Sequence, residues 1–158
     1  MLKDIKKRTE GFTIIEVLIV LAIAGLILLI VFLAVPALQR NSRNTAMKND
    51  VSAVLGGISE YANLNNGAFP NQVATSGSKV TIDNTSGSDT KAVANVQGST
   101  TAEDGNAPQG GLSGTDVTPG KIIIVFGKTC GGSNSTRAVS AWYSVEAQGG
   151  NHNQCQDS

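Results

Sequence analysis

The sequence predicts an α+β protein in which one long N-terminal helix packs on a small antiparallel β-sheet. Three observations favour this fold class. A long apolar stretch lies near the N-terminus, a stripe of apolar residues with helical spacing follows it, and two apolar segments with the character of strands come after residue 120. The length of 158 residues is enough for one domain and a helix that projects from it.

The apolar stretch is long enough to cross a membrane. Residues 17–35 contain no charged or amide side chain, and in a helix these nineteen residues would span about 28 Å. Glu16 lies just inside the apolar run, which begins at Phe12. A carboxylate in such a place costs about 2.5–3.5 kcal/mol by insertion scales, and less near the interface. Because this cost has to be offset, Glu16 is a candidate functional residue.

An ordinary signal peptide explains this stretch poorly, and a simple membrane anchor leaves Glu16 unexplained. Signal peptides have an apolar core of about 7–15 residues and a small-residue cleavage site. The stretch here is longer, and Val35-Pro36-Ala37 makes a poor cleavage site. Basic residues crowd the segment 1–11 before the stretch, which favours a cytoplasmic N-terminus and an exported C-terminal part.

The helical pattern continues beyond the apolar stretch but becomes one-sided. Apolar residues recur three and four positions apart, and the stripe consists of Met47, Val51, Val54, Leu55, Ile58, Tyr61 and Ala62. The residues expected off this stripe are Arg43, Lys48, Asp50, Ser52 and Asn63. Such a stripe needs a partner, and the C-terminal part of the chain is the candidate. One helix over residues 12–64 would be about 80 Å long and would end at C-cap residues 65–67, before Pro70.

Gly25 and Pro36 are expected to weaken the apolar half of this helix. Proline lacks the N–H that would bond the carbonyl of Phe32, and it disfavours helical backbone at Val35. Glycine adds about 1 kcal/mol of further weakness. The sequence leaves open whether this part of the helix is kinked or loses its helical structure.

Residues 71–120 are rich in Ser, Thr, Gly, Asn, Asp and Gln and are expected to form surface loops. Within them, residues 79–83 are expected as a short strand and residues 90–97 as a short helix or strand. The triplets 84–86 and 134–136 match the glycosylation acceptor pattern, which arises readily in polar sequence. The carboxylates at 103, 104 and 116 could ligate calcium, but they lack EF-hand spacing, which favours solvated turn residues.

Two segments after residue 120 are expected to form the core of a sheet. Residues 121–127 (KIIIVFG) read as a strand buried on both faces or nearly so, whereas residues 138–147 alternate between apolar and polar. The face expected to pack on the helix stripe carries Val139, Ala141, Tyr143 and Val145. Trp142 points the other way, either beneath a loop or toward a neighbouring subunit.

Cys130 and Cys155 are the two cysteines, and both fall in the part expected to be exported. In an oxidising compartment an even pair indicates a disulfide. The closed loop of about 25 residues would stabilise the fold by roughly 3 kcal/mol. The alternatives are two unrelated buried thiols, or a metal site, which is disfavoured because His152 is the only imidazole nearby.

No catalytic pattern is recognisable, and neither an enzyme nor a cofactor or metal site is expected. His152 is the only histidine and lies among Gly and Asn residues, where a loop position is expected. The sequence has no phosphate-binding loop and no Cys/His metal spacing. Twelve basic and twelve acidic residues balance; without residues 1–11, eight basic and ten acidic residues remain. This balance disfavours nucleic acid as a partner.

The residues Gly11-Phe12-Thr13-Ile14-Ile15-Glu16, followed by the apolar helix, resemble the processing site of type IV prepilins. The resemblance covers residues 6 to about 70 by motif and the rest by general plan. It implies the ladle-shaped pilin fold. It also implies cleavage after Gly11, N-methylation of Phe12, and loss of helicity between glycine and proline, here Gly25 and Pro36, when subunits assemble.

The resemblance divides the chain into four segments: a basic leader peptide (1–11), a transmembrane and filament-core helix (12–38), an amphipathic half of the helix (39–66) and a globular head (67–158) that contains the disulfide. It implies a structural subunit that starts in the cytoplasmic membrane with its N-terminus inside. The subunit then polymerises into an extracellular type IV pilus for surface attachment, twitching motility or DNA uptake.

The implied partners are other copies of the chain, the prepilin peptidase and methylase, the assembly platform with its ATPase, minor pilins, and the membrane of the precursor. Two alternatives remain. One is a pseudopilin or minor pilin of a type II secretion or competence system, and the other is a membrane-tethered adhesin or enzyme that never polymerises.

Glu16 and the amine of Phe12 are expected to form a charge pair between subunits. Cleavage would free an α-amino group with a pKa of about 7.7–8, which is largely cationic at neutral pH. In an apolar bundle each unpaired charge is costly, and pairing removes much of both costs. Thr13 could add a hydrogen bond to the same cluster. The alternative is that Glu16 is satisfied within its own chain, by its own amine or by headgroup water.

Overall fold

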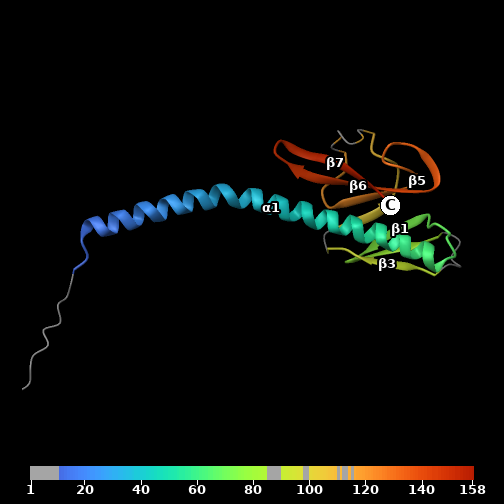
Figure 1. Cartoon of the computed structure of the whole chain (residues 1–158), viewed down its shortest axis with the longest axis horizontal. Coiled ribbons are helices and arrows are strands. Elements are labelled where there is room, and N and C mark those ends of the chain that lie inside the picture. The colour runs from blue at the N-terminus through green and yellow to red at the C-terminus, as the bar shows by residue number, and fades with distance from the viewer. Residues whose placement is uncertain (1–10, 85–89, 98–99, 110, 112–113, 115) are drawn as a thin grey trace, which may run out of the picture. The chain divides into compact units, whose positions relative to one another are not determined.

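The computed structural model describes residues 11–84, 90–97, 100–109, 111, 114 and 116–158. Contacts divide the chain into two units, Met1–Gln39 and Arg40–Ser158, which we call the N-terminal unit and the C-terminal unit. One helix, α1 (Ile14–Leu64), belongs to both units and is coloured blue to green in Figure 1. The strands of the described residues all lie in the C-terminal unit.

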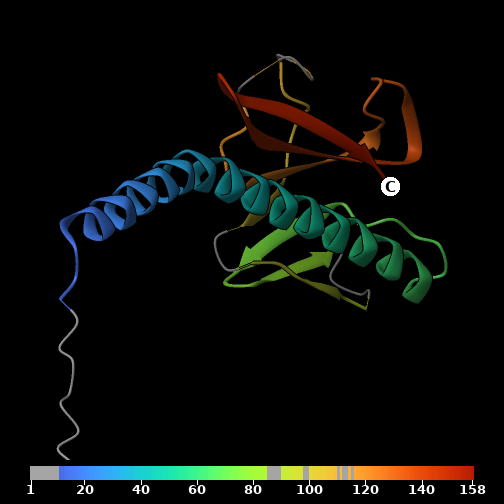
Figure 2. The same cartoon turned by 60° about the vertical axis from the view of Figure 1, so that its left-hand side comes forward.

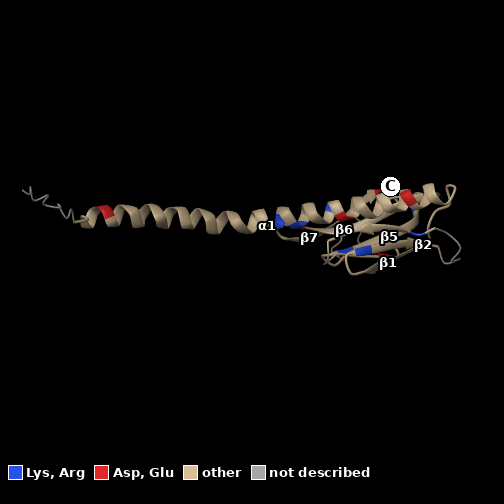
Figure 3. Cartoon of the chain, turned by 90° about the horizontal axis from the view of Figure 1, so that it is seen from below, with Lys and Arg blue, Asp and Glu red and all other residues tan. Residues whose placement is uncertain are grey.

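In the N-terminal unit α1 is apolar on every side. Its large apolar side chains are all exposed, from Ile14 at 82% to Leu38 at 70%. The most apolar part of α1 has a mean hydropathy of 3.4, and by length and composition the helix can cross a membrane. Figure 3 shows one acidic position near the start of α1 and no further charge until the blue positions of the C-terminal unit.

The strands of the C-terminal unit form two sheets (Figure 2). The first sheet is antiparallel and has the order β1 (Gln72–Ser76), β2 (Lys79–Asp83) and β3 (Ala92–Asn95). The second sheet has the order β4 (Thr101–Asp104), β5 (Lys121–Lys128), β6 (Asn134–Ala147) and β7 (Gly150–Asp157). Its strands pair antiparallel except β4 and β5, which are parallel.

The sheets are antiparallel as predicted, with one parallel pair, β4 and β5, that the sequence did not indicate. Parallel neighbours need a long connection that returns the chain to the same end of the sheet. Residues 105–120 supply that length between β4 and β5. The sequence of this segment shows only a polar composition. It therefore does not indicate whether the next strand pairs parallel or antiparallel with β4.

A threonine joins the two sheets where β1 lies beside β4. The Thr75 hydroxyl donates a hydrogen bond of 2.8 Å to the carbonyl of Ala102 and accepts one of 2.6 Å from the N–H of the same residue. One side chain thus satisfies both backbone groups of Ala102 on the side where β4 has no strand neighbour. The two sheets therefore present one surface to the helix.

The core lies between that surface and the part of α1 in the C-terminal unit. In Figure 3 this part of α1 runs along one side of the strands. The predicted β6 face and all of the predicted helix stripe except Ala62 meet in one cluster, and Ala62 is buried as well, which confirms both predictions. Val51, Val54 and Ile58 have no exposed surface, and burying such side chains stabilises a fold by about 1.5–3 kcal/mol each.

Gly57 allows α1 to approach the first sheet closely. A Cβ atom at this position would lie 2.6 Å from Cδ1 of Ile82 and 3.2 Å from Cβ of Ala94. The neighbouring Gly56 faces the other way, and a Cβ there would meet nothing within 4 Å. Of these two glycines, only Gly57 is required by the packing of the unit.

The prediction that residues 71–78 and 98–120 are loops is wrong at two places, because β1 and β4 are strands. Each of them buries only one side chain, Val73 in β1 and Ala102 in β4. Strands this short and polar show no usable alternation, and pairing with neighbours decides their conformation. Residues 79–83 are a strand as predicted, and β3 settles the choice for residues 90–97 in favour of a strand.

The C-terminal tail also differs from the prediction of a loop. Residues 150–157 form β7, the edge strand of the second sheet, and His152 lies on it opposite Val145 with its side chain exposed. On the outer face of β6, Trp142 is only 4% exposed and packs with Val117 and Val125. Of the two alternatives for Trp142, the structure shows the first, burial beneath its own chain.

The long helix ends as predicted. Asn66 and Gly67 adopt positive φ angles of 55° and 85°, a backbone region that asparagine and glycine tolerate best. The N–H of Gly67 donates a hydrogen bond of 2.7 Å to the carbonyl of Ala62, and this bond satisfies one of the last free carbonyls of α1.

Candidate functional site

The helix α1 begins at a capping box formed by Thr13 and Glu16. The carbonyl of Thr13 accepts the first helical hydrogen bond, from the N–H of Val17 at 3.4 Å, so Thr13 is the N-cap residue. The Thr13 hydroxyl accepts a bond of 3.4 Å from the N–H of Glu16, and the Glu16 carboxylate accepts one of 2.9 Å from the N–H of Thr13. This reciprocal pairing is the reason that α1 begins at Ile14 and not at Phe12.

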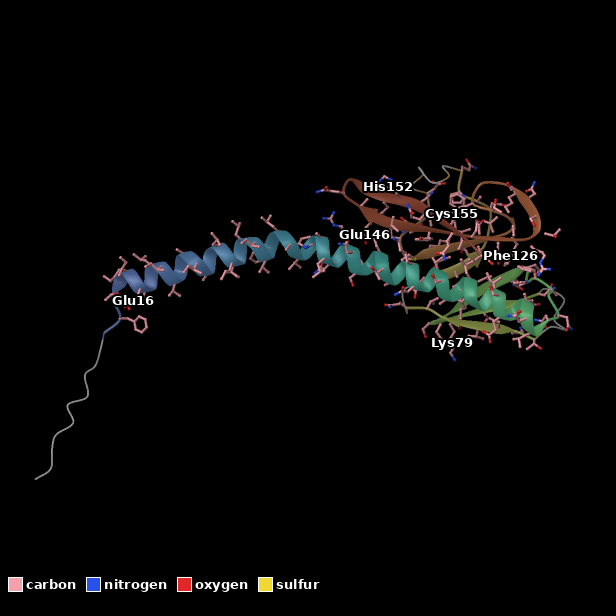
Figure 4. All side chains as sticks on the ribbon, in the orientation of Figure 1. Glu16, Lys79, Phe126, Glu146, His152 and Cys155 are labelled. Carbon is pink, nitrogen blue, oxygen red and sulfur yellow. A yellow bond between two sulfur atoms is a disulfide. The ribbon has the colours of Figure 1, made fainter. Side chains whose placement is uncertain are left out.

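The two carboxylate oxygens of Glu16 are used differently. Oε2 accepts hydrogen bonds from both the N–H of Thr13 at 2.9 Å and the hydroxyl of Thr13 at 2.7 Å. None of the described residues donates a hydrogen bond to Oε1 of Glu16. Figure 4 labels this side chain at the start of α1. In the single chain the acid is therefore satisfied through Thr13, and its second oxygen is open to a donor from outside.

Gly11 and Phe12 precede the helix. Neither residue is helical, and the Phe12 side chain is 84% exposed. A Cβ atom on Gly11 would meet nothing within 4 Å, and Gly11 does not have a positive φ angle. The fold of the chain thus provides no steric reason for a glycine at this position. The rest of the leader lies outside the described residues.

Gly25 and Pro36 both lie within α1, which continues through them as one helix. A Cβ atom on Gly25 would meet nothing within 4 Å. The loss of helicity between these residues concerns an assembled state, and it stays a prediction. The same holds for the charge pair between Glu16 and the amine of a neighbouring Phe12.

A comparison with protein-family models matches residues 6–32 to the prokaryotic N-terminal methylation motif. The chain carries the type IV prepilin signature. No curated protein and no solved structure matches the chain significantly. The motif covers Gly11, the capping box and most of the apolar half of α1. Together with that apolar helix it fits a membrane-anchored precursor of the pilin or pseudopilin type, a class of structural subunits processed by prepilin peptidase.

In the C-terminal unit, one polar side chain of α1 and one just after the helix bond backbone groups at or near the ends of strands. The Asn44 carboxamide donates a bond of 2.8 Å to the carbonyl of Glu146 and accepts one of 2.8 Å from the N–H of Glu146. Asn65 binds Thr90 in the same way, with two bonds of 2.9 Å. Each carboxamide bonds both the N–H and the carbonyl of one residue, as the backbone of a neighbouring strand would. Helical periodicity does not reveal these contacts, because they depend on strand ends far away in the sequence.

Asp50 was predicted to lie off the buried stripe, and this prediction is wrong. Its side chain is 4% exposed and accepts hydrogen bonds from the N–H of Gln97 at 3.1 Å and from the hydroxyl of Thr100 at 2.5 Å. A buried carboxylate is tolerated only when hydrogen bonds replace its hydration. Asp50 therefore holds Gln97 and Thr100 in place, and nothing in its helical position indicated that role.

Arg43 forms a two-point ion pair with Glu146, which Figure 4 labels beside α1. Nε of Arg43 donates to Oε1 of Glu146 and Nη2 donates to Oε2, both at 2.6 Å. This bonding lowers the pKa of the Glu146 carboxyl and raises the pKa of the Arg43 guanidinium. Likewise, the ion pair with Lys91 holds the pKa of Asp83 below its usual value.

Cys130 and Cys155 form a disulfide in the structure, with their Cα atoms 5.7 Å apart. It joins the turn between β5 and β6 to the edge strand β7, and Figure 4 labels Cys155 there. The N–H of Cys130 also donates a bond of 2.7 Å to the Asp157 carboxylate. The disulfide was predicted to tie the tail to the sheet; the tail itself is a strand of that sheet.

The three carboxylates considered as calcium ligands have separate partners. Glu103 forms an ion pair of 2.6 Å with Lys121, and Asp104 accepts a bond of 3.5 Å from the N–H of Val73. Asp116 accepts a bond of 3.2 Å from the Asn153 carboxamide. Asn153 of β7 is fully buried; it also accepts a bond from the N–H of Val117 and donates one to the carbonyl of Gly111. These contacts agree with structural roles for the three acids.

Proposed function

We propose that the chain is a structural subunit of a type IV pilus filament. In this proposal the precursor lies in the cytoplasmic membrane, prepilin peptidase cleaves it after Gly11, and Phe12 becomes the N-methylated first residue. The subunits then polymerise through the apolar half of α1 into an extracellular fibre that serves surface attachment, twitching motility or DNA uptake.

The observation that carries this proposal is one acid at the start of the apolar half of α1, whose other side chains are uncharged and exposed. An apolar surface of this size is unfavourable in water and is expected to be covered by lipid or by other apolar helices. Once inside either environment, Glu16 needs a polar partner. Its Oε1 has no donor among the described residues, and cleavage would create a cationic amine at Phe12. A neighbouring copy would supply that amine. The pairing with Glu16 would then set the axial offset between neighbouring helices, while burial of the apolar surfaces would drive their association.

The test is to shear surface material from cells that express the chain and to identify its main component. We expect thin filaments by electron microscopy, and a subunit mass that begins at N-methylated Phe12. Fibres that contain uncleaved chains starting at Met1 would contradict the proposal. A processed chain that occurs only in trace amounts beside another major subunit would instead indicate a minor pilin or a pseudopilin.

The amine can be located directly in a map of the assembled fibre. We expect the amine of Phe12 from one copy within hydrogen-bond distance of Glu16 in the next copy. A fibre in which the acid faces lipid or water, with no amine near it, would leave the apolar helix as a tether and remove the charge-pairing role.

A further inference from the structure

The peptide bond between Gly11 and Phe12 lies two residues before the first helical residue, Ile14. In an extended segment both sides of a peptide bond are open to an enzyme, and such segments are preferred sites of proteolysis. Inside a helix the carbonyl accepts a hydrogen bond from the residue four positions later. If α1 extended backwards by one turn, the carbonyl of Gly11 would accept from the N–H of Ile15 and would no longer be free.

Two arrangements can satisfy the free N–H groups at the start of α1. One is a cap, in which side chains accept their hydrogen bonds. The other is backward extension of the helix, in which the carbonyls of Gly11 and Phe12 accept them. In an apolar environment an unsatisfied N–H is costly, so removing the first arrangement favours the second. The side chain of Thr13 therefore decides between them.

We propose that Thr13 is a positioning residue for processing: its hydroxyl caps α1 and thereby keeps the carbonyl of Gly11 out of the helix. This inference rests on the proposed cleavage after Gly11. Three contacts carry it, namely the bond from the Glu16 N–H to the Thr13 hydroxyl, the bond from the Thr13 N–H to the Glu16 carboxylate, and the bond between the two side chains.

Gly11 acts in the same direction. Glycine is tolerated at an N-cap but is about 1 kcal/mol less favourable than alanine in a helix interior, so it opposes any extension that continues past residue 11. Its hydrogen side chain meets no constraint inside the chain. The cap and the glycine together favour an extended peptide on both sides of the bond to be cleaved.

The test uses the full-length precursor in detergent micelles with a prepilin peptidase. Thr13→Val keeps the shape of threonine but cannot cap, and Thr13→Ala favours the helix most. Thr13→Ser and Thr13→Asn differ in shape but can cap. Loss of a cap is expected to lower kcat/KM about fivefold or more. The loss should appear mainly in KM, because a smaller fraction of the precursor is competent to bind.

Glu16→Ala removes the two contacts made by the Glu16 carboxylate but leaves the Thr13 hydroxyl free to accept from the N–H of residue 16, so it isolates the hydroxyl cap. It should be cleaved faster than Thr13→Val. A second readout needs no enzyme: the carbonyl carbon shift of Gly11 and the amide exchange of Ile15 should become helix-like in Thr13→Val and Thr13→Ala only.

Three outcomes would overturn the inference. Cleavage of Thr13→Val and Thr13→Ala at the rate of the unchanged chain would show that the cap is dispensable. Rescue by serine but not by asparagine, with an unchanged Gly11 shift, would show that the enzyme recognises the hydroxyl of residue 13 directly. An unchanged chain that is not cleaved after Gly11 would overturn the proposed function as well, so the two failures are distinguishable.

Discussion

The carboxamide of Asn44 and the backbone of Glu146 form two hydrogen bonds of 2.8 Å, one in each direction. Asn44 lies on α1, and Glu146 lies near the end of β6. The relationship couples the helix to the strand end independently of the apolar core. Asn44 lies near the start of the C-terminal unit, next to Arg43, whose ion pair with Glu146 holds the same strand end.

Replacing Asn44 by alanine should therefore destabilise the C-terminal unit. Two hydrogen bonds are lost and two partly buried backbone groups of Glu146 are left without partners, which we expect to cost about 2 kcal/mol. Thermal unfolding of the full chain in detergent measures the loss. Asn49→Ala is the matched control, because Asn49 is exposed on the same helix. Equal stability of the two variants would contradict a role for the clamp.

The adjacent glycines of α1 should respond oppositely to alanine. Gly56→Ala adds a methyl group where nothing lies within 4 Å, and it should raise the free energy of unfolding by about 1 kcal/mol through helix propensity. Gly57→Ala places a methyl group 2.6 Å from Cδ1 of Ile82 and should lower stability. The denaturation midpoints of the two variants test this prediction. A higher midpoint in both variants would show that the first sheet shifts easily to make room for the added methyl group.

Acid should destabilise the C-terminal unit through Glu146 and Asp83. Arg43 and Lys91 lower the pKa values of these two carboxyls in the folded chain. The unfolded chain then binds more protons in this range, so stability is present above pH ~4.5 and is lost as the pH falls through the folded pKa values. Glu146→Gln should make the stability less dependent on pH below this point. The effect should be small and should shrink in salt, because Arg43 is half-exposed.

Reduction of the disulfide between Cys130 and Cys155 should lower the stability of the C-terminal unit without unfolding α1. The bridge closes a loop of 25 residues, for which the chain-entropy model gives about 3 kcal/mol. Unfolding with and without reductant measures this, with the double variant Cys130→Ser/Cys155→Ser for comparison. An unchanged midpoint after complete reduction would show that pairing of β7 with β6 alone holds the tail.

Two variants of Glu16 separate its charge from its capping function. Glu16→Gln can still accept from the N–H of Thr13, whereas Glu16→Ala cannot. If the charge pair drives assembly, both variants should be exported and cleaved, and neither should form normal filaments. Sheared fractions and electron microscopy give the answer. Normal filaments from Glu16→Gln alone would assign the residue to capping, and normal filaments from both would remove the charge-pairing role.

Much of the fold could be predicted because its main signals are local. The apolar run, the stripe from Met47 to Ala62 and the alternation along β6 each reflect one face of one element, and they are visible in a window of a dozen residues. The strands β1, β4 and β7 were missed because they bury few side chains. Their conformation depends on ladders with neighbours that the sequence does not name.

The candidate site was visible in the sequence for the same local reason. Gly11, Phe12 and Glu16 lie within six residues, and a carboxylate beside a long apolar run is conspicuous. The roles of Asn44, Asp50 and Asn65 were not visible. Each contacts a backbone group at least 25 positions away, and a polar residue on a helix carries no mark of such a partner.

By itself, the sequence determined that this chain has a long N-terminal helix, apolar at first and one-sided later, with a prepilin processing motif at its start. Hydrophobic periodicity and a contiguous motif are properties of neighbouring residues, so no fold is needed to read them. Only the tertiary structure decided that Asp50 is buried and that β4 runs parallel to β5. Each of these depends on which distant or competing hydrogen-bond partner is within reach, and that is settled only when the chain is folded.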